Sequence, residues 1–538
     1  MRVMTPEEMR ETDGRAVRDF GISEEILMER AGMAVSRVCR EWLGRTALRS
    51  GRRPVLAVAG GGHNGADSLV ALRDLVSLGY SGEAFVVVEE ANRQSPALLR
   101  EIDRLRRMEV PVRFPSEGGG RHRISHAGLI IDGILGTGFR GELPEDLLRL
   151  VEAMNQSAAS GIPVVSVDIP SGVDGRTGAV GRSAVRAATT VTFGAPKWGL
   201  LVDPGTRYAG EIRLSRIGFP SALLEGGSGS CLTIREAMGL LPRRYPEIHK
   251  GQAGHVLIAG GSFGKAGAPL LAARGALRAG AGLVTLLWDR DLSGYSNAFP
   301  EVMGRFFNPS NPDPGAIRGT FEGIDAMGCG PGLPDDEGTR ILMETLLSGF
   351  PGPVVADAGT FSLFAGRPER VAELRGGKKL VLTPHPGELG RFLGVGTPEV
   401  LKEPLDMALS GARKANGVLL LKGARTLVVD AAGRHYVNLT GDPVMAGAGM
   451  GDVLTGMIAA FLGQGMEPFE AACLGAFIHG AAGERLGRGS SRGRLASELA
   501  DEIPGLLSDW EPLSDPPPLP EEEPLTLWPV RPPAGGNR

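Results

Sequence analysis

The sequence contains little lysine, few cysteines and no long apolar run. Of its 538 residues, 8 are Lys and 50 are Arg. The four cysteines lie far apart, with neither the close spacing of a metal site nor the density of a disulfide framework. No apolar stretch approaches the roughly 20 residues of a membrane-spanning helix. Residues 1–19 are rich in Arg and Glu, where a secretory signal would be apolar. We therefore expect a soluble cytoplasmic protein.

Charge of neither sign predominates. The formal net charge is −4, and acidic and basic residues are mixed along the chain. This pattern gives no support for a nucleic-acid or polyanion surface. We expect small-molecule substrates, no nucleic-acid or membrane partner, and a homo-oligomer. Because lysine is scarce, the lysines in Gly- or Pro-rich segments are of interest: Lys197, Lys250, Lys265 and Lys422.

Short apolar runs alternate with helical periodicity, which is typical of parallel α/β layers. The length favours several domains. We expect one α/β domain over residues 1–222, a Gly- and Ser-rich linker over 223–231, a second α/β domain over 232–507, and a Pro- and Glu-rich disordered tail over 508–538. Expected strands of the first domain are 55–59, 84–88, 128–132, 163–168 and 189–193. Those of the second are 255–259, 283–287, 323–327, 354–357, 379–383, 418–422 and 426–429.

Three expected strands of the first domain end in Gly-rich or polar turns, at residues 60–67, 133–142 and 168–172. The carboxyl ends of strands are where open α/β sheets bind ligands, so these turns should lie together. Two such turns could hold a pyrophosphate. Asn64, Asp132 and Ser171 are hard oxygen donors that could share a cation. Asp168 is a candidate acid or base. The alternatives are a turn cap for Asp168 and an ordinary loop histidine for His63.

Four segments of the second domain could form one site, at residues 249–268, 383–388, 421–426 and 446–452. Lys422 and Arg425 offer positive charge to a diphosphate. Asp452 could accept a hydroxyl proton while the amides of 448–451 stabilise a moving phosphoryl group. His385 is a polar contact or a proton-transfer group. The alternatives are a solvated cation for Lys422, a turn histidine for His385 and a simple Gly-rich turn before Asp452. The chain has no P-loop motif.

The first group of motifs, with the segments 27–32 and 192–197, resembles the NAD(P)H-hydrate epimerase (YjeF N-terminal) family over about residues 4–220. That family interconverts the R and S epimers of hydrated nicotinamide nucleotides and holds K⁺. The resemblance implies a Rossmann-like three-layer domain in which Asn64, Asp132 and Ser171 hold K⁺. The substrate contacts that it implies are His63, Asn64, Gly65, Ala66, Asp67, Gly136, Thr137, Gly138, Phe139, Arg140, Gly141, Glu142 and Asp168.

The chain departs from that family's usual motifs at four positions. Arg30 replaces an Asn in the segment 27–32, and His63, Ala66 and Ser68 differ from the usual Asn-Asn-Gly-Gly-Asp-Gly run. The expected cation ligands are retained. We expect the changed loop to alter the fit of the substrate.

The second group of motifs resembles a ribokinase-like fold, and more narrowly the ADP-dependent NAD(P)H-hydrate dehydratase (YjeF C-terminal) family, over about residues 232–507. By this resemblance, Ala268, Gly332, His385 and Asp452 would contact the hydrated nucleotide. Lys422, Gly423, Ala424, Arg425, Thr426 and Gly451 would bind ADP, with Mg²⁺. The implied reaction is phosphorylation of the hydrate hydroxyl, followed by loss of phosphate.

Together these resemblances predict a bifunctional repair enzyme, an isomerase joined to a lyase, with Asp168 and Asp452 as the catalytic residues. Fusion is reasonable because damage produces both epimers while a dehydratase site accepts one. The alternative is a ribokinase-fold small-molecule kinase with a non-catalytic N-terminal binding module. A third interpretation treats the first half as a scaffold.

Overall fold

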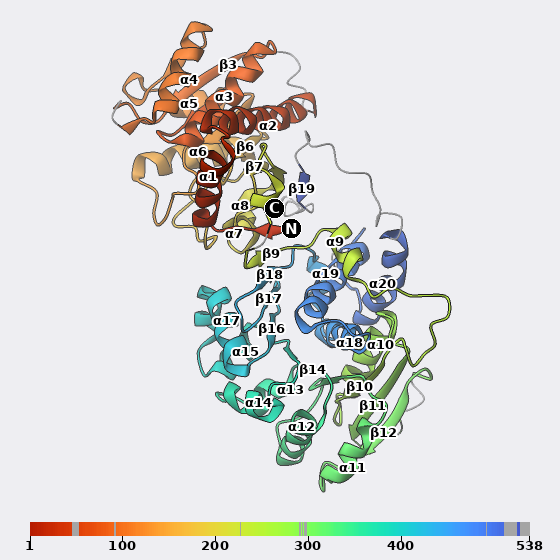
Figure 1. Cartoon of the computed structure of the whole chain (residues 1–538). Helices are drawn as coiled ribbons and strands as arrows, with labels where there is room; N and C mark the ends of the chain where they lie inside the picture. The colour runs from red at the N-terminus through yellow and green to blue at the C-terminus, as the bar shows by residue number, and fades with distance from the viewer. Residues whose placement is uncertain are drawn as a thin grey trace. The chain divides into compact units, whose positions relative to one another are not determined.

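The computed structural model describes residues 1–45, 53–90, 93–225, 227–289, 292, 294, 299–490, 492–510 and 525–527 (Figure 1). The chain forms two compact units. Of the described residues, one unit contains those within 2–227 together with 525–527, and the other contains those within 228–510 together with Met1. In the described part of the chain, every helix is too short or too polar to cross a membrane.

The N-terminal unit is built on a largely parallel sheet with the strand order β19-β8-β7-β6-β5-β2-β3-β4, in which only β19 is antiparallel to its neighbour. The strands are β2 (Val55–Ala59), β3 (Gly82–Val86), β4 (Val112–Arg113), β5 (Leu129–Gly133), β6 (Val164–Val167), β7 (Thr189–Phe193), β8 (Glu211–Ser215) and β19 (Leu525–Leu527). Strands β2, β5, β6 and β7 are buried along their whole length, as expected of a sheet covered on both faces.

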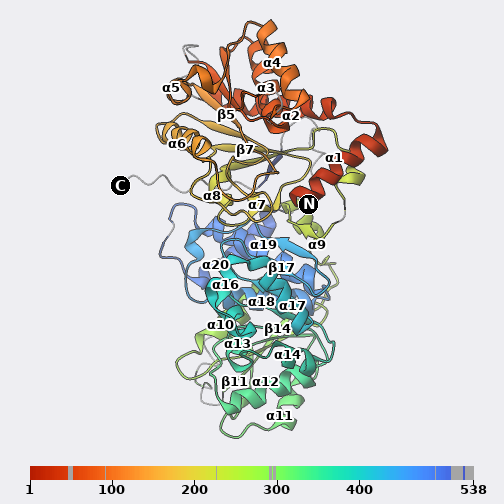
Figure 2. The same cartoon turned by 90° about the vertical axis from the view of Figure 1, so that its left-hand side faces the viewer.

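Helices cover both faces of this sheet, so the unit has three layers. Residues of α1 (Pro6–Phe20), α2 (Glu24–Arg45), α3 (His63–Ser77) and α4 (Pro96–Arg107) pack in one apolar cluster with one set of strand residues. Residues of α5 (Gly120–His126) and α6 (Glu145–Ala159) pack in a second cluster with strand residues of opposite parity. Figure 2 shows α5 and α6 together on one side of β5 and β7. Short helices α7 (Trp198–Leu201) and α8 (Thr206–Ala209) follow β7.

The C-terminal unit has a larger sheet, in which the order β9-β18-β17-β16-β15-β14-β13-β10-β11-β12 is parallel except where β17 pairs with β16 and β18. The strands are β9 (Gly229–Ser230), β10 (His255–Ala259), β11 (Leu283–Asp289), β12 (Met303–Phe307), β13 (Ala326–Cys329), β14 (Val354–Ala356), β15 (Leu380–Leu382), β16 (Val418–Leu421), β17 (Leu427–Val429) and β18 (His435–Val437). Both units are therefore mixed α/β folds built on largely parallel sheets, as the sequence predicted.

Helices lie between most strands of this unit: α9 (Ile234–Leu240), α10 (Gly267–Arg278), α11 (Pro314–Arg318), α12 (Glu337–Gly349), α13 (Gly359–Leu363), α14 (Pro368–Arg375), α15 (Pro386–Leu393), α16 (Thr397–Lys402) and α17 (Pro404–Ala415). Three more helices follow its last strand: α18 (Met450–Gly463), α19 (Pro468–Leu486) and α20 (Ala496–Trp510). Helices α18 and α19 are buried on nearly every side, in accord with their apolar sequences.

Several boundaries differ from those expected. Strand β3 begins two residues earlier than predicted and β13 three residues later, because a short apolar run does not fix its own ends. Strand β9 lies within the expected linker, and α20 continues to Trp510, into the expected tail. The rest of that tail lies outside the described residues, apart from β19.

Candidate active sites

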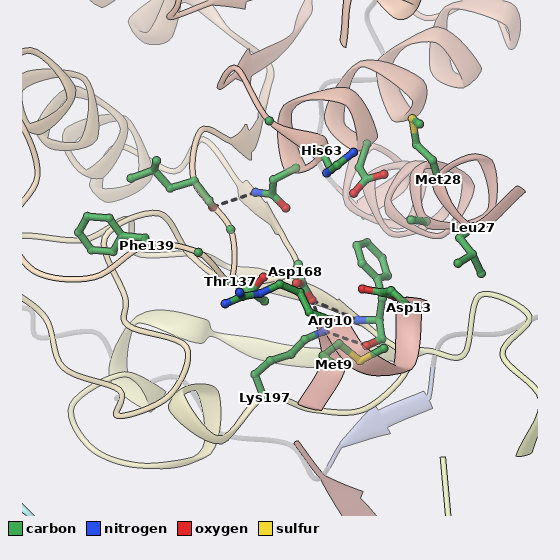
Figure 3. A pocket seen from close by; sticks show the side chains of 18 of the residues that line it. Met9, Arg10, Asp13, Leu27, Met28, His63, Thr137, Phe139, Asp168 and Lys197 are labelled. Atoms are coloured by element: carbon green, nitrogen blue, oxygen red, sulfur yellow. Dashed lines mark hydrogen bonds and ion pairs between the residues drawn. The ribbon is translucent and has the colours of Figure 1, made fainter. Parts of the chain in front are cut away.

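A cavity of about 1020 Å³ opens in the N-terminal unit at the carboxyl ends of its strands (Figure 3). The turns after β2, β5 and β6 all reach it, so the sheet brings the three predicted turns together. Nine of the predicted substrate contacts line the cavity: His63, Asn64, Asp67, Gly136, Thr137, Gly138, Phe139, Arg140 and Asp168. Gly65, Ala66, Gly141 and Glu142 do not. Glu142 instead accepts a hydrogen bond from the Arg182 backbone N–H.

Asp168 follows β6 in the left-handed region, with φ 62°, where a non-glycine residue is uncommon. Its Oδ1 accepts hydrogen bonds from Lys197 Nζ at 2.5 Å and from Thr192 Oγ1 at 3.0 Å. Lys197 is 1% exposed and also donates to the Phe193 carbonyl at 2.8 Å. An ion pair with Lys197 thus holds Asp168 in the cavity wall. Residues with uncommon backbone angles are often found at functional sites, where the surrounding structure holds them in place.

The three predicted cation ligands lie around one backbone position, Leu135. Ser171 Oγ donates to Asp132 Oδ1 at 2.6 Å and accepts from the Leu135 N–H at 2.9 Å. Asn64 Nδ2 donates to the Leu135 carbonyl at 2.8 Å. Burial raises the pKa of Asp132, while hydrogen bonds from Ser171 and Ser166 oppose the rise. The set contains amide, carboxylate and hydroxyl oxygens, which suit a hard cation.

Three further carboxyl groups line this cavity, Asp13 on α1, Glu24 on α2 and Asp67 on α3. The Asp13 side chain is exposed, but partial desolvation by the cavity wall raises its pKa to about 6, with Lys197 opposing the rise and Asp168 adding to it. Burial also raises the pKa of Asp67, and its acidic neighbours add to that effect. Sequence reasoning assigned Asp67 to the substrate but missed Asp13, since a lone Asp on an amphipathic helix carries no motif.

The four departures from the family motif occupy different places. His63 is the first residue of α3 and lines the cavity. Ala66 and Ser68 are fully buried beneath it, and Ser68 Oγ donates to the Gly65 carbonyl at 2.7 Å. Arg30 is exposed and lies against the Gly218 backbone, outside the cavity lining. Of the four, only His63 is placed to contact a ligand directly.

A second cavity, of about 530 Å³, lies in the C-terminal unit. Ala268, Gly332 and Asp452, three of the predicted contacts, line it together with Lys265 and Glu388. Gly332 allows the turns after β10 and β13 to approach closely because it has no side chain. A Cβ at this position would lie only 2.8 Å from the Lys265 carbonyl oxygen. The turns after β10 and β13 and the start of α18 therefore meet at one place.

Lys422 lies beside this cavity at the end of β16. Its Nζ is 2.8 Å from Asp357 Oδ1 and 3.7 Å from Glu388 Oε2. Burial lowers the pKa of Lys422, but Asp357 and Glu388 outweigh that effect, so the net shift is upward. Gly451 lies directly beside Lys422, because a Cβ at Gly451 would be 3.3 Å from Lys422 Nζ. Asp357 was not predicted, although it ends a buried strand as Asp168 does.

Asp452 lies in the first turn of α18, whose N-cap Gly449 has a left-handed φ of 88°. Burial raises the pKa of Asp452 to about 7, and the negative charge of Asp357 adds to the rise. His479 donates to the Met450 carbonyl at 2.9 Å, and burial lowers the pKa of that histidine to about 4. A neutral imidazole therefore supports the start of the helix that carries Asp452.

The remaining predicted nucleotide and substrate residues lie in the turns after β15 and β16. His385 is the N-cap of α15, where its Nδ1 accepts a hydrogen bond from the Gly387 N–H at 3.0 Å. Its ring is 3.5 Å from Glu388, a cavity residue. Gly423 and Ala424 are in the turn between β16 and β17, Thr426 Oγ1 donates to the Gly423 carbonyl, and Arg425 donates to the Leu439 carbonyl.

Comparisons with known proteins support this division into two sites. The family model described as YjeF-related protein N-terminus matches residues 24–199, and the model described as NAD(P)H-hydrate dehydratase matches residues 256–505. The second match covers every residue that lines the C-terminal cavity, and the first covers the lining of the N-terminal cavity except Met9, Arg10, Asp13, Gly14 and Ile217.

Relatives that match nearly the whole chain carry one name, bifunctional NAD(P)H-hydrate repair enzyme. The protein from Moorella thermoacetica is 35% identical, over 95% of this chain and 97% of its own length. That from Escherichia coli is 33% identical, over 92% and 91%. A crystal structure of the ADP/ATP-dependent NAD(P)H-hydrate dehydratase from Bacillus subtilis, co-crystallised with ATP/Mg²⁺, is 30% identical with a TM-score of 0.45, covering 52% of this chain and 99% of that one. This chain belongs to the family of bifunctional NAD(P)H-hydrate repair enzymes.

Proposed function

We propose that the two cavities carry out two successive steps of nicotinamide nucleotide repair. The N-terminal site epimerises R- and S-NAD(P)H hydrate, and the C-terminal site dehydrates the S form at the expense of ADP. One observation carries the proposal: this chain has two separate cavities, and a carboxyl group lines each of them, Asp168 in the first and Asp452 in the second. The protein is accordingly both an isomerase and a lyase.

In the C-terminal site, Asp452 accepts the proton of the hydrate hydroxyl as that oxygen attacks the terminal phosphoryl group of ADP, and AMP leaves. The phosphate then departs with its oxygen, a proton is lost from the adjacent ring carbon, and the double bond of NAD(P)H is restored. Lys422 offers positive charge to the diphosphate, and the amides at the start of α18 stabilise the transferring group. Ala268, Gly332 and His385 are assigned to the hydrated nucleotide, and residues 422–426 with Gly451 to ADP.

Mg²⁺ with the nucleotide would neutralise phosphate charge. The Bacillus subtilis relative was co-crystallised with ATP/Mg²⁺. Glu388 and Asp357 supply carboxylate oxygens near Lys422, which is the donor chemistry that Mg²⁺ prefers. The use of ADP in place of ATP is part of the proposal and is tested by supplying each nucleotide separately.

In the N-terminal site we assign K⁺ to Asn64, Asp132 and Ser171, whose oxygens fit a hard cation. When bound, K⁺ would fix the turn after β5 and offset the charge of buried Asp132. K⁺ should raise the melting temperature of the wild-type protein more than choline does at equal ionic strength. A Ser171→Ala variant should lose that difference; an equal K⁺ effect in the variant would refute the assignment.

Assays of both hydrate epimers with ADP and with ATP test the main proposal. The enzyme should regenerate the near-ultraviolet absorbance of reduced nicotinamide without accumulating a phosphorylated product. A stable phospho-product on a vitamin or sugar would instead favour a ribokinase-fold small-molecule kinase. We also propose a homo-oligomer, for which sedimentation of the full chain is the test.

A further inference from the structure

The N-terminal cavity contains a carboxyl group that the sequence motifs leave without a role. Asp13 comes from helix α1 and lines the cavity, and Figure 3 shows it on the side of that helix, across from the end of β6 that carries Asp168. No hydrogen bond or ion pair holds the Asp13 carboxyl group among the residues that the structure describes. Asp168, by contrast, accepts hydrogen bonds from Lys197 and Thr192.

The chemistry of the substrate requires two proton transfers. The reduced nicotinamide ring is an enamine, so water adds to the ring carbon bonded to nitrogen. The hydrate therefore has a hydroxyl group on a carbon whose neighbouring nitrogen can expel it. An acid must protonate the departing hydroxyl, and a base must take a proton from the water that adds to the other face of the resulting iminium ion.

We propose that Asp13 is one of these two proton-transfer groups and that it works with Asp168 in the epimerase reaction. This inference rests on the proposed function of the N-terminal site. For one epimer, Asp13 gives its proton to the hydroxyl group, the carbon–oxygen bond breaks, and water leaves. A second water then forms a carbon–oxygen bond on the opposite face and transfers its proton to Asp168. The other epimer follows the same steps in reverse, with Asp168 as the acid and Asp13 as the base.

The surroundings of the two carboxyl groups suit these different starting roles. Asp168 begins as the acceptor, because the Lys197 ammonium group is paired with it at 2.5 Å. Asp13 has no such partner. Its side chain is exposed, but the cavity wall partly desolvates the carboxyl group and the negative charge of Asp168 lies nearby, so its pKa is raised to about 6 and it holds a proton more readily than an ordinary Asp. The charged and titratable groups that influence Asp13 or share its cavity are Lys197, Asp168, Glu24, Asp67, Arg10, Arg140 and His63.

The experiment compares Asp13→Asn with Asp19→Asn in the full-length protein. Asp19 lies on the same helix, is exposed and pairs with Arg15, so its variant is a matched control. We expect Asp13→Asn to lower the rate of epimerisation at least 100-fold, with the Michaelis constant for the hydrate changed less than about threefold. Asp19→Asn should keep the wild-type rate. The dehydratase activity on the S epimer should be unchanged in both variants, which verifies the C-terminal unit. An unchanged melting temperature of the N-terminal unit verifies that the unit carrying the substitution is folded.

The pH profile separates proton transfer from a structural role of Asp13. In the wild type, kcat/KM for both epimers should fall on the alkaline side with an apparent pKa of about 6, because the reactive form keeps one proton on the Asp13–Asp168 pair. Asp13→Glu should retain part of the rate and shift this alkaline limb. Asp13→Asn should lack the limb in its residual rate.

Three outcomes would overturn the inference while leaving the proposed function intact. The first is a wild-type epimerisation rate in Asp13→Asn, and the second is an unchanged alkaline fall of kcat/KM in that variant. The third is that this alkaline fall is lost in Asp67→Asn but kept in Asp13→Asn. If the wild-type protein itself does not epimerise the hydrate above the rate without protein, the proposed function of the N-terminal site fails instead. The two failures are therefore distinguishable.

Discussion

Lys422 and Asp357 form the charged centre of the C-terminal site, with Nζ 2.8 Å from Oδ1. The second oxygen of Asp357 accepts a hydrogen bond from Thr455 Oγ1 on α18, also at 2.8 Å. One buried carboxylate thus joins the end of β14, the end of β16 and the helix that carries Asp452. It holds in place both Lys422, which we propose binds the nucleotide, and the helix that carries Asp452, the proposed base.

Replacement of Asp357 by Asn should damage the dehydratase while sparing the epimerase. The variant leaves Lys422 with Glu388 as its remaining close partner, and losing one member of a buried pair costs about 3–5 kcal/mol. We expect kcat/KM for ADP to fall at least 10-fold and the C-terminal unit to melt at a lower temperature. Steady-state assays of both activities and calorimetry on one preparation measure these effects.

The control is Asp406→Asn, which makes the same chemical change at an exposed position of α17 in the same unit. It should leave both activities and the melting temperature near the wild-type values. A normal rate with ADP in Asp357→Asn would show that turnover does not require Asp357 as the partner of Lys422.

The dehydratase rate should follow the ionisation of Asp452. Its pKa is raised to about 7, first by burial and then by the charge of Asp357. The reaction requires the carboxylate, whose fraction rises with pH, so kcat/KM should fall about 10-fold per pH unit below 7 and level off above it. Asp452→Asn should bind ADP nearly as well as the wild type, turn over at least 100-fold more slowly, and lack the limb. An acidic limb that persists in this variant would remove Asp452 from its role.

Much of this architecture follows from local sequence. Strands such as β2 and β10 are buried on both faces and therefore appear as short apolar runs, which identify them within a few residues. The candidate turns were found because a parallel sheet gathers the carboxyl ends of its strands at one edge. Asn64, Asp132 and Ser171 meet around Leu135 for this reason, although they are far apart in sequence.

What could not be predicted depends on packing between distant elements. Asp13 reaches the cavity only because α1 packs against the sheet, and nothing in the sequence of that helix specifies its partner surface. Asp357 had the same signal as Asp168, an Asp at the end of a buried strand, but its importance comes from Lys422, 65 residues later. For His385 the sequence identified the residue but not its structural role. That His385 is the N-cap of α15 is evident only from the folded backbone.

Replacement of Lys197 by Met should impair the N-terminal unit in both stability and activity. Lys197 donates to Asp168, Thr192 and the Phe193 carbonyl, and its loss leaves the Asp168 carboxylate without its cation. We expect a loss of about 3 kcal/mol in the free energy of unfolding of this unit and at least a 100-fold slower epimerase. Urea titration and the epimerisation assay test this. The dehydratase activity of the same chain is the internal control.

Arginine should not rescue this position, although it carries the same charge. Lys197 is 1% exposed, and a planar guanidinium group needs more room and a different set of acceptors. A fully active Lys197→Arg protein would mean that charge alone, without the compact geometry, supports Asp168.

The close crossing of α10 and α18 should also be required for dehydratase activity, because α18 carries Asp452. A Cβ on Gly456 would lie 1.8 Å from the Ala272 carbonyl oxygen, so Gly456→Ala must push the two helices apart. We expect a loss of about 1–3 kcal/mol in stability and a slower dehydratase, with the epimerase unchanged.

Gly239→Ala on α9 is the matched control, since a Cβ there meets nothing within 4 Å. That variant should be as stable as the wild type or more stable, because Ala favours the helix over Gly by up to about 1 kcal/mol. Equal melting temperatures and dehydratase rates in the two variants would refute the requirement for this contact.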